Sequence, residues 1–94
     1  MLTVTDGAKQ TLRELLLETT DDPEIGLRLV VRAVEPVRTG LVADREKPGD
    51  FVVHDDVYKV LLVAAEVAKV VAGATMDSED TPDGTRLVIF REPP

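Results

Sequence analysis

The chain has no cysteine, few aromatic residues and one serine, and each shortage excludes a class of protein. Without cysteine there is no disulfide scaffold, no Cys-ligated zinc or iron–sulfur site, no c-type haem and no thiol nucleophile. The aromatic residues are Phe51, Tyr58 and Phe90, too few for the stacking platforms that bind single-stranded nucleic acids. Ser78 lies among acidic residues, outside any nucleophile-elbow motif. We therefore expect neither a catalytic residue nor enzymatic activity.

Positive charge is also scarce, because 11 Lys and Arg face 18 Asp and Glu and leave a net charge of −7. This charge opposes binding to nucleic acid phosphates and to anionic lipids. The N-terminus lacks a basic segment followed by an apolar one, and no apolar run approaches the roughly 18 residues that span a membrane. We therefore expect a cytoplasmic protein that binds neither nucleic acid nor membrane.

The length and composition predict one globular domain over residues 1–94. The chain is 44 % hydrophobic and 31 % charged, and it has no internal repeat and no low-complexity linker. A chain of this size buries only about 60–65 % of the surface that its unfolded form exposes. Self-association would bury further surface, so a homodimer is one oligomeric state that we expect.

Hydrophobic periodicity predicts an α+β fold. Apolar residues at helical spacing indicate an amphipathic helix from Thr5 to Thr20, capped by Thr5 or Asp6. Alternation over Ile25–Val34 indicates a half-buried strand. The rest of the pattern predicts, in chain order, a reversal at 35–40, a short strand at 41–43, a turn at 47–50, a strand at 51–54 completing an antiparallel meander, a strand at 57–62, a helix at 63–71, and a closing hairpin of 74–79 and 86–91.

Valine-rich segments leave two interpretations open. Residues 30–31, 52–53 and 60–63 place apolar side chains on both faces of their strands. Such strands occur in sheets that are buried on both sides, and also in sheets with an apolar patch that binds a partner. The sequence does not choose between full burial and a patch used in self-association.

Several segments resemble the A-type iron–sulfur cluster carriers, also called HesB- or IscA-like proteins. Residues 26–32, Gly-Leu-Arg-Leu-Val-Val-Arg, are similar to the family's Gly-Leu-Arg-Leu-x-Val-Arg strand. Further similar segments, in the family's order and spacing, are residues 2–6 before the first helix, 48–53, 57–63, 72–77 and 83–90. The resemblance covers nearly the whole chain and implies a small mixed β sandwich-like domain with two helices.

The resemblance also implies where cluster ligands would stand. Family members bind clusters through one cysteine after the Arg-containing strand and two in a Cys-x-Cys near the C-terminus. The first position falls at Pro36, and the second would lie beyond Phe90. Iron–sulfur clusters select soft thiolates, which this chain lacks. We therefore expect no metal or cofactor, and our leading hypothesis is a cysteine-free relative that serves as a protein-interaction or structural module with an unidentified protein partner.

Three arginines are the candidate interaction or anion-binding surface. Arg28 and Arg32 share one face of the predicted strand, and Arg38 follows in the predicted loop. Guanidinium groups bind carboxylates and phosphates in a bidentate manner, so the three could hold an acidic partner or a small anionic ligand. The competing interpretation is that they pair with carboxylates of this acidic chain.

His54, followed by Asp55 and Asp56, is the remaining candidate for chemistry. Imidazole and carboxylate can ligate a metal, which keeps a residual iron or iron–sulfur carrier as an alternative function. However, adjacent residues of a strand point in different directions, and no metal-binding spacing accompanies them. We therefore interpret this tripeptide as a solvated strand end, and the acidic stretch at 77–83 as a solvated turn.

Overall fold

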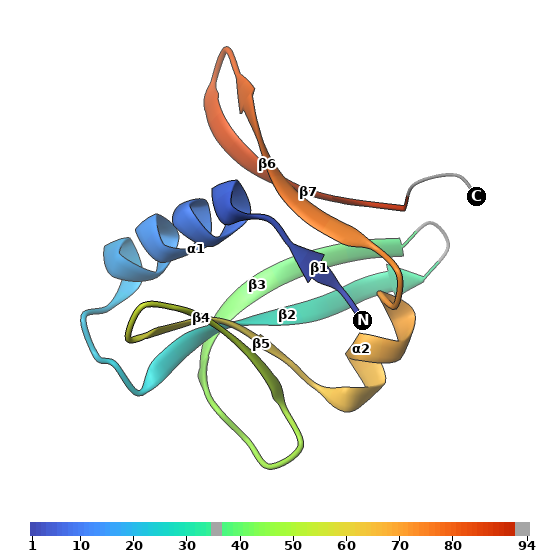
Figure 1. Ribbon diagram of the computed structural model, residues 1–94, viewed down its shortest axis with the longest axis horizontal. Coiled ribbons are helices and arrows are strands. Elements are labelled where there is room, and N and C mark those ends of the chain that lie inside the picture. Colours follow the sequence, from blue (N-terminus) through green and yellow to red (C-terminus); the bar gives the residue numbers. More distant parts are fainter. Residues whose placement is uncertain (35–36, 92–94) are drawn as a thin grey trace.

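Two β-sheets and helix α1 enclose one apolar core (Figure 1). The computed structural model describes residues 1–34 and 37–91. Over these residues the elements are β1 (Thr3–Val4), α1 (Asp6–Thr19), β2 (Ile25–Val34), β3 (Val37–Arg45), β4 (Phe51–Asp55), β5 (Tyr58–Val63), α2 (Ala65–Val70), β6 (Thr75–Thr81) and β7 (Gly84–Phe90). The α+β class and the two predicted helices are confirmed.

The sheet topology differs from the predicted meander. The four-stranded sheet has the order β3-β2-β5-β4, so β5 lies between β2 and β4, and β4 pairs with β5 instead of β3. The pairing of β2 with β5 is parallel, whereas β2–β3 and β4–β5 are antiparallel. The three-stranded sheet has the order β1-β6-β7, with the two-residue strand β1 parallel to β6. Periodicity could not reveal these parallel pairs, because they join segments far apart in the sequence.

The first helix follows its sequence signals. Thr5 is the N-cap, and its side-chain oxygen accepts a hydrogen bond of 3.1 Å from the amide of Ala8. The Thr5 hydroxyl also donates a 2.7 Å hydrogen bond to Asp77 of β6, which ties the start of α1 to the three-stranded sheet. Helix α1 contacts strands of both sheets. The core that it covers consists of Ala8, Leu12, Leu16, Leu27, Leu29, Val60, Leu61, Val63, Val71, Ala74 and Met76.

Alternation along β2 also holds. Leu27 and Leu29 are buried in the core, and Arg28 between them lies on the opposite face of the sheet. Of the valine-rich segments, residues 60–63 are buried, whereas 30–31 and 52–53 are half-buried. Neither sequence interpretation therefore applies to all of them.

Three boundaries depart from the predictions. Strand β3 begins at Val37 and runs to Arg45, longer than the predicted 41–43. Strand β5 continues to Val63, so α2 covers only Ala65–Val70 of the predicted 63–71. The closing hairpin of β6 and β7 agrees with the prediction, and its tip extends away from the body of the molecule in Figure 1. In the part of the chain described, neither helix has the length and apolarity needed to cross a membrane.

Candidate functional site

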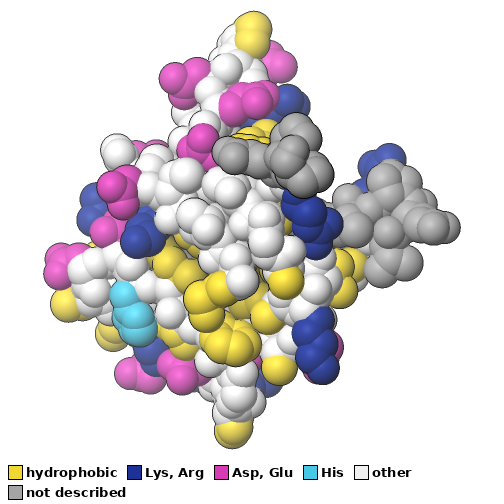
Figure 2. Space-filling view, turned by 45° about the vertical axis from the view of Figure 1, so that its right-hand side comes forward, with side chains coloured by type: hydrophobic (Ala, Val, Ile, Leu, Met, Phe, Trp, Pro, Cys, Tyr) yellow, Lys and Arg dark blue, Asp and Glu magenta, His cyan; other side chains and the backbone are white. Residues whose placement is uncertain are grey.

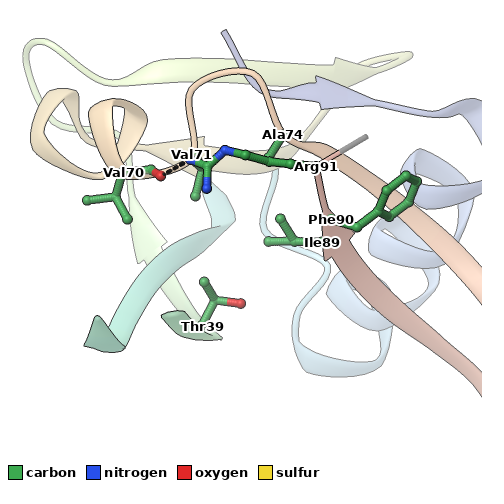
Figure 3. A pocket seen from close by; sticks show the side chains of 7 residues that line it. All are labelled: Thr39, Val70, Val71, Ala74, Ile89, Phe90 and Arg91. Atoms are coloured by element: carbon green, nitrogen blue, oxygen red, sulfur yellow. Dashed lines mark hydrogen bonds between the residues drawn. The ribbon is translucent and has the colours of Figure 1, made fainter. Parts of the chain in front are cut away.

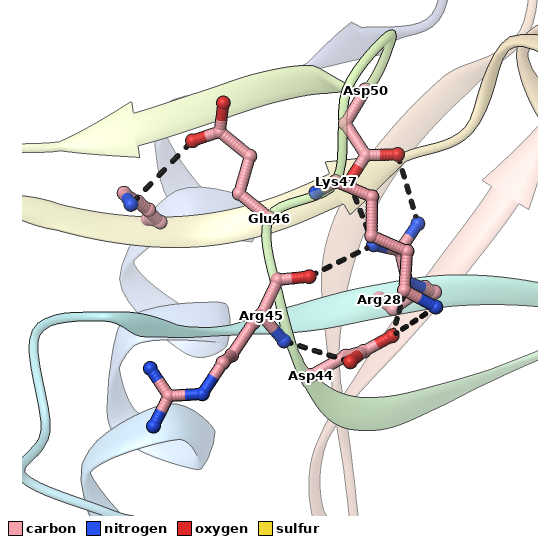
Figure 4. Close-up of polar contacts among 7 residues, drawn as sticks. Arg28, Asp44, Arg45, Glu46, Lys47 and Asp50 are labelled. Atoms are coloured by element: carbon pink, nitrogen blue, oxygen red, sulfur yellow. Dashed lines mark hydrogen bonds and ion pairs between the residues drawn. The ribbon is translucent and has the colours of Figure 1, made fainter.

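Arg28 is the centre of a buried ion-pair network (Figure 4). Its Nε donates to Asp44 at 2.7 Å, and its Nη1 and Nη2 donate to the two carboxylate oxygens of Asp50 at 3.0 and 2.6 Å. Nη2 also donates to the backbone carbonyl of Arg45 at 3.1 Å. The side chains of Arg28 and Asp50 are only 10 % and 3 % exposed. This is the bidentate geometry that arginine forms with a carboxylate.

The network keeps all three groups charged. Hydrogen bonds from the Arg28 side chain and from the Arg45 backbone amide lower the pKa of Asp44 to about 2, and the one from Arg28 has the larger effect. The same guanidinium lowers the pKa of Asp50, against a desolvation effect that acts in the opposite direction. In return, the hydrogen bond to Asp50 raises the pKa of Arg28.

The network fixes the connection between β3 and β4. Asp50 accepts a 2.8 Å hydrogen bond from the Lys47 amide, and its own amide donates to the Lys47 carbonyl at 3.1 Å. Gly49 permits this turn because its φ of +86° is in the left-handed region that side chains disfavour. Arg28 therefore positions a loop of its own chain. Its Nε, Nη1 and Nη2 atoms all donate hydrogen bonds there.

The other two candidate arginines lie apart from Arg28, near the end of the β2–β3 pair. Arg32 is at the irregularity in the β2–β3 register, and its side chain covers the backbone of Gly40. Arg38 is not in a loop as predicted; it is a β3 residue opposite Ala33. Both arginines are exposed. The fold thus places Arg32 and Arg38 near one end of the β2–β3 pair and Arg28 further along β2. An interaction or anion surface formed by the three arginines stays a prediction.

His54 and its neighbours do not converge on a common point. His54 is exposed in β4 opposite Lys59, and Asp55 forms an ion pair of 3.4 Å with Arg13 of α1. Asp56 turns the chain with a φ of 57°. Within residues 1–34 and 37–91, no group of three His, Asp or Glu side chains could hold a metal ion.

The end of β7 lies beside the start of β3 and the end of α2 (Figure 3). Together they line a pocket of about 250 Å³. Arg91 donates to the carbonyls of Val70 and Ala72 at 2.5 and 3.3 Å, so its guanidinium caps α2. The remaining described lining is Thr39, Val71, Ala74, Ile89 and Phe90, which offers a single hydroxyl. Pro36, where the resemblance places the first cluster ligand, lies outside the described residues, and so do residues 92–94.

The most apolar depression among the described residues is formed by three distant segments, the N-terminus, β4 and α2. We call it the apolar groove. Its volume is about 500 Å³, and hydrophobic side chains gather beside the single histidine in Figure 2, on the face that carries β4. Phe51 is 46 % exposed there, although it is one of the largest apolar side chains in the protein. The described lining is Met1, Leu2, Phe51, Val52, Val53, Val63, Ala65, Ala68, Lys69 and Ala72.

Sequence reasoning found part of this groove and missed the rest. The apolar residues Val52 and Val53 fall on both faces of their strand, and this pattern indicates an apolar patch as one interpretation. Nothing in the pattern around Phe51 predicts its part in a groove, apart from its being aromatic. The contribution of α2 is a row of alanines, which in sequence indicates only a helix. These small residues form the floor of a groove because the larger Phe51 projects beside them. Only the tertiary structure places Phe51 next to α2.

The arrangement of two sheets, α1 and α2 defines the class of fold to which this chain belongs. It is the fold of the A-type iron–sulfur carriers, as the sequence motifs imply. A structure of Escherichia coli SufA, involved in biosynthesis of iron–sulfur clusters, matches with a TM-score of 0.73 and 23 % identity, covering 96 % of this chain and 84 % of that chain. A structure of IscA with the [2Fe-2S] cluster matches with a TM-score of 0.68 and 19 % identity, covering 97 % and 85 %. No protein-family model and no curated protein sequence matches the chain.

The donor set of this chain does not fit an iron–sulfur cluster. The sequence contains no thiolate at any position, and the described pocket beside β7 presents a hydroxyl and an already bonded guanidinium. Hydroxyl, guanidinium and carboxylate groups do not replace the soft sulfur ligands that such clusters select. The chain therefore has the carrier fold without the cysteine ligands.

Proposed function

We propose that the chain is a non-catalytic protein-interaction module that binds its partner in the apolar groove. The observation that carries this proposal is the exposed Phe51 beside a row of small α2 side chains, in a depression whose described lining has one charged residue, Lys69. Contiguous apolar surfaces of this kind mark sites where monomeric proteins bind partners. Full burial of an exposed phenylalanine side chain contributes about 1.5–3 kcal/mol. Phe51 is 46 % exposed, so covering the rest of it would supply roughly half of that amount to a binding free energy.

The charges around the groove suggest the chemistry of the partner. Lys69 is exposed on α2 at the groove, within a chain whose net charge is −7. A segment with apolar side chains for the groove and a carboxylate for Lys69 would match both features. We therefore propose an amphipathic peptide segment of another protein as the occupant.

A non-catalytic role is supported by the way the buried charges are used. Arg28 and Asp50, the most buried ion pair among those described, are bonded to each other and to the backbone of the β3–β4 loop, so their charges hold that loop. His54 is exposed, and it belongs to no group of three metal-ligating side chains among the described residues. Catalytic groups are usually brought together in a cleft with strongly shifted pKa values, and this chain uses such shifts for its loop.

The test is selection of ligands by the purified chain from a random-peptide phage library, followed by chemical-shift mapping of the best peptide. We expect the peptides to combine apolar residues with an acidic one, and the shifts to cluster at Phe51, Ala65 and Ala68. Phe51→Ser should abolish binding. Val57→Ser is the matched control, because Val57 is 68 % exposed in the β4–β5 turn and does not line the groove.

Two outcomes would overturn the proposal. One is that no peptide is enriched over a blank surface. The other is that Phe51→Ser and Val57→Ser bind the selected peptide equally well, since binding would then occur outside the groove.

A further inference from the structure

Strand β4 forms one edge of the four-stranded sheet, beside the apolar groove. It stands last in the strand order β3-β2-β5-β4, and among the described strands it pairs only with β5. Within residues 1–34 and 37–91, no backbone hydrogen bond outside the β4–β5 ladder reaches residues 51–55. In an antiparallel ladder, alternate residues direct their N–H and C=O groups to opposite sides. At least one of residues 51–53 therefore directs both groups away from β5.

The features that usually protect a sheet edge are confined to one half of β4. Natural proteins protect such edges with charged side chains, proline or an irregular register. The half formed by His54 and Asp55 carries the charge, and it follows the register shift after Val53. The half from Phe51 to Val53 contains neither a charged residue nor a proline, and its pairing with β5 is regular. This half can therefore pair with a further strand.

The apolar groove follows the same half of the edge. Phe51, Val52 and Val53 all line it. Successive side chains of a strand point to opposite faces of the sheet, so a hollow on one face would be lined by alternate residues. A groove that is lined by three consecutive residues extends around the strand edge. An occupant of the groove would therefore lie against the backbone of β4 as well as against its side chains.

An extended occupant would use both the backbone and the side chains of this site, whereas a helical one would use only the side chains. An α-helix is about 10–12 Å across and satisfies its own backbone groups, so it would form no hydrogen bonds with the edge of β4. An extended segment pairs with the edge while every second side chain enters the groove. The small floor residues Ala65, Ala68 and Ala72 leave space there for those side chains beside Phe51.

Lys69 indicates the charge that the segment should carry. Strand β5 pairs its last residue, Val63, with Phe51 and then leads into α2, which carries Lys69 at the groove. The cation is therefore near the Phe51 end of β4. A carboxylate at the end of the segment that passes Phe51 would be complementary to it.

We propose that the partner binds as an extended segment that adds a strand to β4 along residues 51–53 and inserts alternate side chains into the apolar groove. This inference rests on the proposed function and states its binding mode. The segment has apolar residues at every second position, no proline over the paired residues and a carboxylate at one end. Main-chain hydrogen bonds give affinity in this mode, and the groove gives specificity.

The probe for the test is a synthetic peptide with the sequence most enriched in the phage selection. It is compared with variants that each carry one backbone N-methyl group, which removes a donor and leaves the side chain unchanged. Only alternate amides of an added strand face β4. We therefore expect alternate N-methyl variants to bind about tenfold more weakly or worse, and the variants between them to bind within about twofold of the parent peptide. The tolerated positions are the matched control.

Two measurements on the protein complement the peptide series. The peptide should slow amide hydrogen exchange at alternate residues of 51–53, because their N–H groups become bonded to it. Lys69→Glu should weaken binding of an acidic peptide about tenfold. Lys9→Glu is the matched control, because it changes the net charge equally and lies on α1, outside the groove lining. Equal binding by these two variants would overturn the assignment of the carboxylate to Lys69.

The results distinguish the failure of this inference from the failure of the proposed function. A peptide that requires Phe51 but tolerates N-methylation at every position would overturn strand addition and leave the groove as the binding site. Selected peptides with apolar residues at helical spacing would have the same consequence. Enrichment of no peptide would overturn both the inference and the proposed function.

Discussion

Replacing Arg28 by methionine is expected to destabilise the protein strongly at neutral pH. The substitution leaves the Asp50 carboxylate, whose side chain is 3 % exposed, without its bidentate partner. It also removes a hydrogen bond from Asp44 and one to the Arg45 carbonyl. Breaking a buried pair by removing one member costs about 3–5 kcal/mol, mostly because an uncompensated charge stays buried.

The lower end of that range applies here, because Asp44 is partly exposed and solvent screens it. We expect a loss of about 3 kcal/mol, against a total of roughly 5–14 kcal/mol for a domain of this size. In a thermal melt, this corresponds to a decrease in Tm of about 12–24 °C. Arg86→Met is the matched control, because Arg86 pairs with Glu79 on the surface with side-chain exposures of 66 % and 43 %. Such an exposed pair contributes about 0–1 kcal/mol.

The pH dependence separates an electrostatic effect from a packing effect. Both Asp44 and Asp50 have a pKa below the unfolded value of about 3.9, and that of Asp44 is about 2. Their contribution to stability is therefore complete above the unfolded pKa and is lost as the pH falls through the folded pKa. The wild type should lose stability from about pH 5 to pH 2, and Arg28→Met should lose much less, so the two curves converge in acid.

Urea denaturation followed by far-UV circular dichroism at pH 7, 5 and 3 measures these differences. Two results would refute the reasoning: a loss below about 1 kcal/mol at pH 7, or a loss that is the same at pH 7 and pH 3. The double variant Arg28→Met with Asp50→Asn provides a further check. It should be less destabilised than the sum of the two single variants, since the second substitution removes the orphaned charge.

Substitutions at Gly26, Gly40 and Thr5 test the packing of the strands and the start of α1. A side chain at Gly26 would meet a backbone carbonyl of β5 at 2.6 Å, so Gly26→Ala should cost about 1–3 kcal/mol in urea denaturation; a neutral result would contradict the close approach of β2 and β5. Gly40→Ala should cost less than about 0.5 kcal/mol, because it meets only the flexible Arg32 side chain. Thr5→Ala should lower stability by about 1–2 kcal/mol through loss of the cap on the Ala8 amide, with Thr5→Ser restoring most of it, and equal stability of all three would exclude the cap.

Local signals accounted for most of the secondary structure. The capped amphipathic α1, the alternation in β2 and the turn between β6 and β7 are all properties of neighbouring residues, so the sequence alone predicted them. Two boundaries could not be predicted in this way. Val63 has the apolar character of both a strand and a helix, and only its pairing with Phe51 in the sheet assigns it to β5. The length of β3 depends similarly on its register against β2, which extends from Arg45 back to Val37.

The sequence by itself determined the chemistry that this protein lacks: a chain without cysteine has no thiolate for a cluster in any fold. It also determined the α+β class, because periodicity is written into neighbouring residues. Only the tertiary structure decided the roles of the charged and apolar side chains. Arg28 became a buried positioning group because the fold brings Asp44 and Asp50 to it, while Phe51 became the wall of a groove because α2 stands beside it. Those roles depend on contacts between distant segments, which sequence spacing does not encode.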